Sequence, residues 1–279
     1  MTTTEFQTFA ALIHQKSGIS LGELKFELLR ARLGKRLRAL KLQSFKDYQA
    51  VLNADSSGLE LERLVDVVTT NKTEFFREAK HYDHLVGELL PAFLASAAAK
   101  KGQPLRIWSA ACSSGEEPYS LSMVLHEALA GRADFKVLAT DISSRVLHRA
   151  MEGRYDSDRI QGVPTALRER YFDTEKLEGE KTYRVKPLLR DTVHFSRFNL
   201  NDASQYVFEN SFDAILCRNV MIYFDRPTQE AVVGRLSRHL APGGCLYTGF
   251  SESLIGIRHP LKAVGASVYR LRGAWEPQA

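Results

Sequence analysis

From residue 105 onwards, short apolar segments alternate with amphipathic ones, and this alternation constrains the fold more than any other feature. "LRIWSA" and "FKVLATD" are composed like buried strands, and the helical patterns "EEPYSLSMVLHEAL" and "SSRVLHRAME" follow them. Strands that alternate with helices predict a doubly wound parallel sheet with right-handed crossovers. Ligands bind such sheets at the carboxyl ends of the strands, so the turns after the strands are the first candidates for a site.

The same pattern resumes near the end of the chain. "FDAILCRNV" predicts another core strand, "RPTQEAVVGRLSRHL" its helix, and "CLYTGF" and "SVYRLR" the last strands. The interruption covers about residues 155–200, where "KTYRVKP" and "DTVHFSRF" alternate like antiparallel strands. These residues predict a small antiparallel β insert on the rim of the ligand crevice.

The beginning of the chain is helical throughout. Phe6, Phe9, Ala10 and Ile13 have the spacing of one buried helix face, and leucines continue that spacing over residues 26–40. We therefore expect an all-helical domain over residues 1–75, a linker helix over 76–102, and an α/β domain over 103–279.

One segment accounts for the formal charge of +5 and the pI near 9.0. Residues 23–41 hold seven basic and two acidic residues, so the rest of the chain is neutral by formal count. On a helical wheel four of these side chains gather on one flank: Lys25, Arg32, Lys35 and Arg36. This flank predicts docking of an acidic partner, and the alternative is an ordinary solvated helix face. A charge confined to one segment argues against a generally polycationic nucleic-acid binder.

The turn "SAACSSGEEPYS" follows the first strand and contains one glycine and two adjacent glutamates. Gly115 permits a close approach of the backbone to a ligand, while Glu116 and Glu117 would repel a phosphate and favour a cation. Acids in a first helical turn are also ordinary complements of the helix dipole. Asp141 ends the next strand, where doubly wound folds place the carboxylate that binds ribose. Together these residues predict S-adenosylmethionine, an adenosine-containing cation that is bound without contacts to a phosphate.

The cysteines, the histidines and the absence of long apolar runs limit the kinds of site and the location that the sequence allows. Cys112, Cys217 and Cys245 are odd in number and widely separated, so we expect reduced thiols in or near the core. His81 and His84 lack a third ligand, so we expect them at the surface and predict no metal. No apolar run is long enough to span a membrane, and no leader is evident, so we expect a cytoplasmic protein without membrane insertion. Nothing in the sequence demands a dimer.

Five motifs resemble, in order, those of the bacterial chemotaxis receptor glutamate methyltransferases, the CheR family. They are "NKTEFFRE", "SAACSSGEEPYS", "ATDIS", "NL" at residues 199–200, and "CRNVMIYF", and the resemblance spans about residues 5–271. It implies a helical domain followed by a Rossmann-like methyltransferase domain with a β insert and a final antiparallel strand. It also implies methyl transfer from S-adenosylmethionine to glutamate side chains on the cytoplasmic methylation helices of chemoreceptors.

The resemblance also implies roles for individual residues. Arg77 and Tyr223 would lie at the reaction centre and orient the substrate or the cofactor, and Asp141 would hold the ribose. Either Glu116 or Glu117 would meet the cofactor's polar groups. The full cofactor set would be Asn71, Thr73, Arg77, Glu116, Glu117, Asp141, Asn199, Leu200, Arg218 and Asn219.

This chemistry is consistent with the lack of a catalytic dyad, since a glutamate is already ionised near pH 7 and needs no general base. Some family members use the β insert to bind a peptide at the receptor's carboxyl terminus. The turn here, "FDTEKLEGEKTYRV", has one glycine where peptide-binding members have a glycine-x-glycine turn, so we expect direct recognition of the methylation region without a tether. Two other functions remain: a nucleic-acid methylase, which the motif "RNVMIYF" does not match, and a non-enzymatic receptor-binding module.

Overall fold

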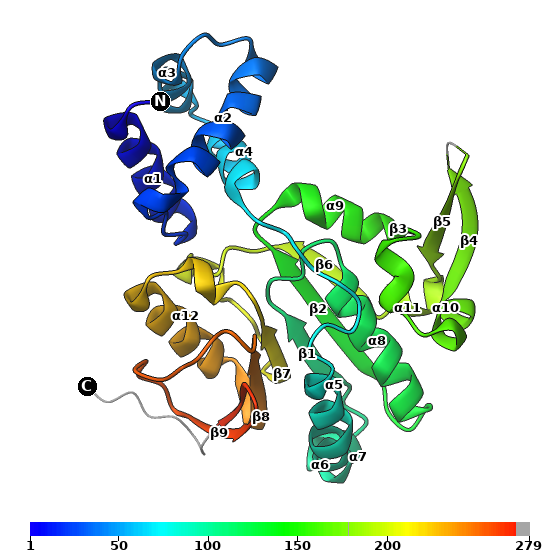
Figure 1. The fold of residues 1–279 in the computed structure, drawn as a ribbon. Helices are drawn as coiled ribbons and strands as arrows, with labels where there is room; N and C mark the ends of the chain where they lie inside the picture. Colours follow the sequence, from blue (N-terminus) through cyan, green and yellow to red (C-terminus); the bar gives the residue numbers. More distant parts are fainter. Residues whose placement is uncertain (178, 272–279) are drawn as a thin grey trace.

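The computed structural model describes residues 1–177 and 179–271, and it divides them between a helical domain and an α/β domain (Figure 1). The helical domain contains α1 (Thr3–Ser17), η1 (Glu23–Lys25), α2 (Phe26–Leu40), α3 (Phe45–Ala54) and α4 (Leu59–Val68). Thr2 and Ser44 form capping boxes at the starts of α1 and α3, and Gly18 ends α1 in a left-handed conformation. The apolar spacing seen in the sequence buries Phe9, Ile13 and similar side chains between these helices.

The segment that joins the domains is less regular than the single helix that the sequence predicts. A loop over residues 69–79 leads into α5 (Lys80–His84), a π-helical turn (Leu85–Leu89), α6 (Leu90–Ala95) and α7 (Ala97–Lys100). Pro91 at the start of α6 has no N–H to donate to the preceding turn, and the π-helical turn lies directly before it. Ser96 adopts an extended conformation and caps α7, which separates α6 from α7.

The core of the α/β domain is a seven-stranded sheet with the order β6-β2-β1-β7-β8-β10-β9. Its strands are β1 (Leu105–Ser109), β2 (Phe135–Asp141), β6 (Val193–Arg197), β7 (Phe212–Cys217), β8 (Leu240–Thr248), β9 (Leu261–Gly265) and β10 (Val268–Leu271). The five strands from β6 to β8 are parallel, and β10 is antiparallel to both of its neighbours, as predicted. The main helices are α8 (Glu116–Leu129), α9 (Ser144–Glu152) and α12 (Arg226–Arg238), and α12 lies on the opposite side of the sheet from α8 and α9 (Figure 1).

The β insert is smaller than the sequence predicts. Three antiparallel strands, β3 (Arg154–Asp156), β4 (Phe172–Leu177) and β5 (Glu180–Val185), form a separate sheet in the order β3-β5-β4. The helical turn η3 (Arg159–Gly162) and helices α10 (Thr165–Tyr171) and α11 (Pro187–Arg190) accompany it. The assignment of "DTVHFSRF" to this insert is wrong, because β6 pairs in parallel with β2 at the edge of the main sheet. The alternation of apolar and polar residues predicts a strand, but it cannot show whether that strand belongs to the main sheet or to the β insert.

The two domains contact each other beside the carboxyl ends of the strands. Ile19 forms an antiparallel bridge with Phe224, and the Ser20 N–H donates to the Tyr223 carbonyl at 2.8 Å. His14 Nε2 lies 2.9 Å from a carboxylate oxygen of Asp225. These contacts connect the end of α1 to the 3₁₀ turn η5 (Met221–Tyr223), which follows β7.

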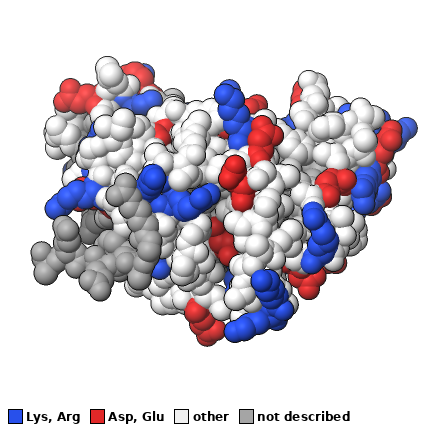
Figure 2. All heavy atoms as spheres, turned by 90° about the horizontal axis from the view of Figure 1, so that it is seen from below, with Lys and Arg blue, Asp and Glu red and all other residues white. Residues whose placement is uncertain are grey.

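The exterior carries charges of mixed sign, and the cysteines lie inside. Figure 2 shows Lys and Arg interspersed with Asp and Glu over the face seen from below in Figure 1. The three cysteines are free and buried, as predicted. In the described part of the chain, no helix is both long and apolar enough to cross a membrane.

Candidate active site

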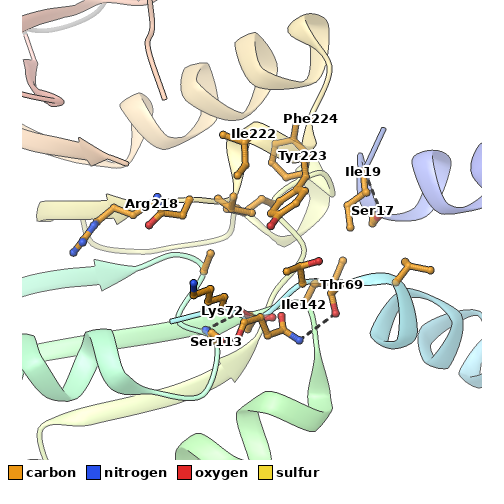
Figure 3. Close-up of a pocket in the computed structure, with 18 of the residues that line it drawn as sticks. Ser17, Ile19, Thr69, Lys72, Ser113, Ile142, Arg218, Ile222, Tyr223 and Phe224 are labelled. Atoms are coloured by element: carbon orange, nitrogen blue, oxygen red, sulfur yellow. Dashed lines mark hydrogen bonds between the residues drawn. The ribbon is translucent and has the colours of Figure 1, made fainter. Parts of the chain in front are cut away.

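A cavity of about 320 Å³ lies between the helical domain and the carboxyl ends of the central strands. This volume falls in the range of small-molecule sites. Figure 3 shows Ile222, Tyr223 and Phe224 on one side of it, and Thr69 and Lys72 on the opposite side. The predicted residues that line it are Asn71, Thr73, Arg77, Glu117, Asp141, Asn199, Leu200, Arg218, Asn219 and Tyr223.

Two carboxylates at the ends of β1 and β2 form its inner acidic wall. Glu117, in the first turn of α8, accepts from the Ser109 hydroxyl at 2.6 Å, and burial raises its pKa despite the opposing effect of Arg218. Asp141 accepts from the backbone N–H groups of Ser113 at 2.9 Å and Ser143 at 3.0 Å. Burial raises the pKa of Asp141 to about 6. The cavity therefore has carboxyl groups at adjacent strand ends.

The other glutamate of the pair points elsewhere. Glu116 is fully buried, accepts from the Ser114 hydroxyl at 2.8 Å, and is ion-paired with Arg159 next to the β insert. It does not line the cavity. Successive residues in a helix point about 100° apart, so only one of the two glutamates can face this cavity from α8.

Gly115 has a role that differs from the predicted one. It has a φ of +96°, and a Cβ there would lie 2.9 Å from Ala150 and from the Tyr155 hydroxyl. Those atoms belong to α9 and β3, so the glycine permits close packing of the turn against the protein. The cavity wall at this turn is formed instead by Ala110, Ala111 and Ser113.

The loop after α4 contributes Asn71, Thr73 and Arg77. The Asn71 carbonyl accepts from the Ser113 hydroxyl at 3.2 Å, and the Asn71 amide donates to Thr69 at 3.3 Å. Arg77 donates to the Lys72 carbonyl at 3.2 Å. These local hydrogen bonds hold an irregular loop against the turn after β1, so that it forms a wall of the cavity.

The loop after β7 contributes Arg218, Asn219 and Tyr223. Asn219 has a φ of +58°, and its N–H donates to the buried Glu252 carboxylate at 2.7 Å. The same carboxylate accepts from Gly249 at 2.7 Å and from Ile222 at 3.2 Å. Glu252 therefore fixes the path of the loop. The sequence does not predict this role, because Asn219 and Ile222 lie about 30 residues earlier in the chain.

The opposite end of the cavity is formed by Asn199 and Leu200 together with the helical domain. The Asn199 amide donates to the Lys16 carbonyl at 2.6 Å, and its oxygen accepts from the Asn201 N–H at 3.0 Å. This side chain therefore connects α1 to the main sheet. Sequence reasoning missed the helical domain's contribution to the wall, namely Ser17, Ile19, Ser20, Leu21 and Leu28. The C-terminal glycine of α1 marks where that segment begins, but only the fold brings it to the cavity.

A buried ionic cluster that the sequence does not predict extends from the wall of the cavity to Glu78. Arg218 is 4 % exposed and lies between two carboxylates: its Nε is 3.1 Å from Glu78 Oε2, and its Nη1 is 3.3 Å from Glu117 Oε2. The expectation that His81 lies at the surface is wrong. It packs against Tyr247 and Phe250, and burial together with Arg218 lowers its pKa to about 4. An aromatic histidine ring on the buried face of α5 fills core space, and spacing alone cannot show this.

The predicted basic flank divides into two kinds of residue. Arg36 pairs with the buried Glu60, with its Nε 2.7 Å from Glu60 Oε1. Arg32 hydrogen-bonds the Val68 carbonyl and donates to the Thr70 hydroxyl at 3.0 Å, which ties α2 to the end of α4. Lys25 and Lys35 are exposed, and Lys25 also lines the cavity. Two of the four side chains are thus engaged in holding the helical domain together.

Comparison with known proteins identifies the fold and the family. The model "CheR methyltransferase, all-alpha domain" matches residues 4–69, and "CheR methyltransferase, SAM binding domain" matches residues 71–270. The chain belongs to the CheR methyltransferase family. It is therefore an S-adenosylmethionine-dependent methyltransferase, as the sequence resemblance predicted. Membership of this family also accounts for the helical domain. A sheet with helices on both sides does not by itself require such a domain.

Curated relatives cover nearly the whole chain. The "Chemotaxis protein methyltransferase 2" of Pseudomonas aeruginosa is 40% identical over 96% of this chain and 93% of its own length. The "Chemotaxis protein methyltransferase" of Borreliella burgdorferi is 38% identical over 92% of this chain and 90% of its own. The "Probable chemotaxis protein methyltransferase" of Rhizobium etli is 36% identical over 93% and 96%, respectively.

The residues present fit S-adenosylmethionine. The cavity is lined by Glu117 and Asp141, whose carboxylates can accept hydrogen bonds from an ammonium group and from ribose hydroxyls. An acidic wall also suits a ligand with a positively charged sulfur. Within the described residues, no group of three or more histidine, cysteine, aspartate or glutamate side chains is placed to hold a metal ion.

Proposed function

We propose that this CheR-family enzyme methylates glutamate side-chain carboxylates on the cytoplasmic methylation helices of chemoreceptors. When bound, S-adenosylmethionine supplies an activated methyl group on a sulfonium. The carboxylate oxygen forms a bond to the methyl carbon as the sulfur–carbon bond breaks, and the electron pair of that bond remains on sulfur. The products are a glutamate methyl ester and S-adenosylhomocysteine, and no proton is transferred.

The single observation that carries this proposal is the distribution of charge in the cavity. Glu117 and Asp141 line it as carboxylates, and Lys25, Lys72, Arg77 and Arg218 line it as cations. The carboxylates suit the cationic cofactor, and the cations suit an acceptor that arrives as an anion. A carboxylate is such an acceptor at pH 7, whereas the amino group of a nucleobase is not.

The chain's own residues would act mainly by binding and orientation. We propose that Asp141 binds the ribose and that Glu117, rather than Glu116, meets the cofactor's ammonium group. Asn71, Thr73, Asn199, Leu200, Arg218 and Asn219 complete the cofactor site in this proposal. Because the nucleophile is already ionised, the residues beside it need to fix its position and exclude water rather than remove a proton.

Arg77 and Tyr223 line the same cavity from two different loops. An arginine offers two N–H groups in a plane that matches a carboxylate, and a tyrosine hydroxyl offers one donor. We propose that these two side chains orient the glutamate and the methyl group at the reaction centre.

We propose that residues 1–75 form the receptor-docking domain, with Lys25 and Lys35 as the exposed cations of the predicted basic flank. Arg32 and Arg36 contribute to the field of that surface but are held by their own partners. We further propose that docking needs no peptide tether at the β insert. The turn concerned joins β4 to β5 and includes position 178, which lies outside the described residues.

Methyl transfer can be tested with methyl-tritiated cofactor and membranes that contain chemoreceptors. We expect label on the receptor that is released by base as methanol, which identifies an ester. Receptors whose methylation-region glutamates are replaced by alanine provide the control and should remain unlabelled. Base-stable label, or label on nucleic acid, would refute the proposed acceptor.

A further inference from the structure

Arg77 stands between two residues whose backbones adopt the left-handed conformation. Phe76 has a φ of +55° and Glu78 a φ of +57°, values that residues other than glycine rarely adopt. In the part of the chain that the structure describes, no other two non-glycine residues with positive φ lie this close together in the sequence. Such conformations persist only where the surrounding structure enforces them, and they are most common at functional sites. Their position on either side of a cavity-lining arginine points to a function of this turn.

The first of the two residues is held by helix α8. The Phe76 N–H donates to the Ser120 hydroxyl at 3.0 Å, and that hydroxyl in turn donates to the Glu116 carbonyl at 2.7 Å. Ser120 is fully buried, so solvent does not compete for this hydrogen bond. The Phe76 ring packs edge-on against Tyr82, with the ring centres 5.9 Å apart. The backbone of Phe76 is therefore attached to the main helix that follows β1.

The second residue is held by three other segments. The Glu78 carboxylate accepts from the Phe250 N–H at 2.9 Å, after β8, and from Arg218 Nε at 3.1 Å, after β7. The Glu78 carbonyl accepts from the His81 N–H at 3.0 Å, where α5 begins. The turn over residues 76–78 is thus fixed at both ends by partners from distant parts of the chain.

Of the three residues in this turn, only Arg77 lines the cavity. Its carbonyl accepts a hydrogen bond from the buried Arg218 guanidinium, so the peptide group after Arg77 is also held. Its Nη1 donates to the Lys72 carbonyl at 3.2 Å, within the same loop. Because the Arg77 side chain extends from a backbone that is fixed on both sides, its guanidinium has a defined place in the cavity wall before any ligand binds.

We propose that Ser120 and the left-handed turn over residues 76–78 position Arg77 for methyl transfer. Ser120 does not line the cavity, so it is a positioning residue that acts through Phe76 on Arg77. An arginine that is already in place need not be ordered at each turnover, and misplacing a catalytic group by about 1 Å can cost roughly a hundredfold in rate. This inference rests on the role at the reaction centre that is proposed above for Arg77.

The first test compares two serines of α8. Ser120→Ala removes the acceptor of the Phe76 N–H, and with receptor membranes and methyl-tritiated cofactor we expect kcat to fall about tenfold. The calorimetric Kd for S-adenosylmethionine should stay at the wild-type value. Ser122→Ala is the matched control, because Ser122 is also fully buried and its hydroxyl lies 2.7 Å from the Thr192 hydroxyl. It should lower the free energy of unfolding to a similar extent but leave kcat unchanged. Equal losses of kcat in the two variants, or no loss in Ser120→Ala, would overturn the proposal.

A double-mutant cycle shows whether Ser120 acts through Arg77. Arg77→Ala alone should lower kcat strongly, and adding Ser120→Ala should then change it less than about twofold. A further loss of about tenfold in the double variant would refute the inference and leave the role of Arg77 intact. If Arg77→Ala alone has the wild-type kcat, the proposed role of Arg77 is wrong and the inference fails with it.

The order of the turn can be measured without any methyl acceptor. The ¹⁵N heteronuclear NOE of the Arg77 backbone amide reports motion on the picosecond to nanosecond timescale. We expect this NOE to fall in Ser120→Ala and to keep its wild-type value in Ser122→Ala. An unchanged NOE in Ser120→Ala would overturn the inference whichever group accepts the methyl.

Discussion

The molecule contains two buried clusters of glutamate and arginine that differ in how completely their charges are paired. In the helical domain, Glu60 accepts from Arg36 Nε at 2.7 Å and from the Tyr48 hydroxyl at 2.9 Å, and the more exposed Arg63 lies 3.5 Å from its other oxygen. Beside the cavity, Glu78 and Glu117 share the single guanidinium of Arg218. The first cluster is closed, because both oxygens of its one carboxylate are paired. The second is open, because two carboxylates share the guanidinium of Arg218 and one of them, Glu117, lines the cavity.

The pKa shifts reflect this difference. The hydrogen bonds from Arg36 and Tyr48 outweigh the burial that opposes them, so the pKa of Glu60 is lowered. At Glu117 burial dominates and Arg218 compensates only in part, so its pKa is raised. A carboxylate whose charge is fully compensated within the protein stabilises the fold, whereas an under-compensated one is available to a ligand.

The largest effect is expected from breaking the closed cluster. Glu60→Ala leaves Arg36 partly buried without its partner, and we expect a loss of about 3 kcal/mol in the free energy of unfolding. The Kd for S-adenosylmethionine should not change under conditions where the variant is folded. Urea unfolding and calorimetric titration measure the two quantities. If cofactor affinity fell in parallel with stability, the functional distinction between the clusters would be wrong.

Removing a carboxylate from the open cluster beside the cavity should lower cofactor affinity and leave the free energy of unfolding almost unchanged. Glu117→Gln removes the carboxylate that lines the cavity, and we expect cofactor affinity to fall by about 2 kcal/mol, roughly thirtyfold in Kd. Stability should be unchanged or slightly higher, since a buried carboxylate with a raised pKa is costly to keep ionised. Glu116→Gln, one residue away and facing Arg159, is the matched control and should leave cofactor affinity near wild type.

The sequence predicts one side of this comparison better than the other. Glu117 and Asp141 follow strands in a βα pattern, and strand ends meet at one edge of a parallel sheet, so their function can be inferred from local pattern. The sequence cannot show which of Glu116 and Glu117 faces the cavity, because this depends on where Arg159 of the β insert lies. Glu78 stands in a recognisable motif, but its partners are 140 and more residues away in the chain.

The helical domain shows the same limit. The apolar spacing of α1 and α2 predicts their buried faces, because neighbours on one helix determine that pattern. The helical wheel places Arg36 on a basic flank, but its partner Glu60 is 24 residues further along the chain and on a different helix. The sequence predicts β6 in the wrong sheet for a related reason, since strand pairing is a long-range property that local alternation does not encode.

The next effect depends on pH and should separate binding from stability. The pKa of Asp141 is raised to about 6, so lowering the pH from 7 to 5 protonates the carboxylate proposed to bind the ribose. If only the ionised form binds, cofactor affinity should fall roughly tenfold over that range. Asp141→Asn should bind weakly with little change over the same range. A wild-type affinity that is constant from pH 7 to pH 5 would exclude this role for Asp141.

Stability should respond with the opposite sign at Asp141. Its folded pKa lies above the unfolded value of 3.8, so the ligand-free protein gains stability from this group as the pH falls through about 6. Glu60 has a lowered pKa, so its contribution is present above the unfolded value of 4.5 and is lost as the pH falls through the folded pKa. Cofactor affinity should therefore decline at a higher pH than the one at which the helical domain loses this contribution.

The smallest effect is expected at the exposed surface of the helical domain. Lys35 is exposed and, unlike Arg36 one residue away, has no place in the Glu60 cluster. Lys35→Glu should raise the receptor KM a few-fold at low salt, through slower association, and this difference should shrink as salt is added. Cofactor Kd and unfolding should stay at wild-type values. Arg36→Glu is unsuitable for this purpose, because it would place two carboxylates together in a buried pair and report stability rather than docking. Receptor kinetics that are the same for Lys35→Glu and wild type at low ionic strength would show that the docking surface does not include this part of α2.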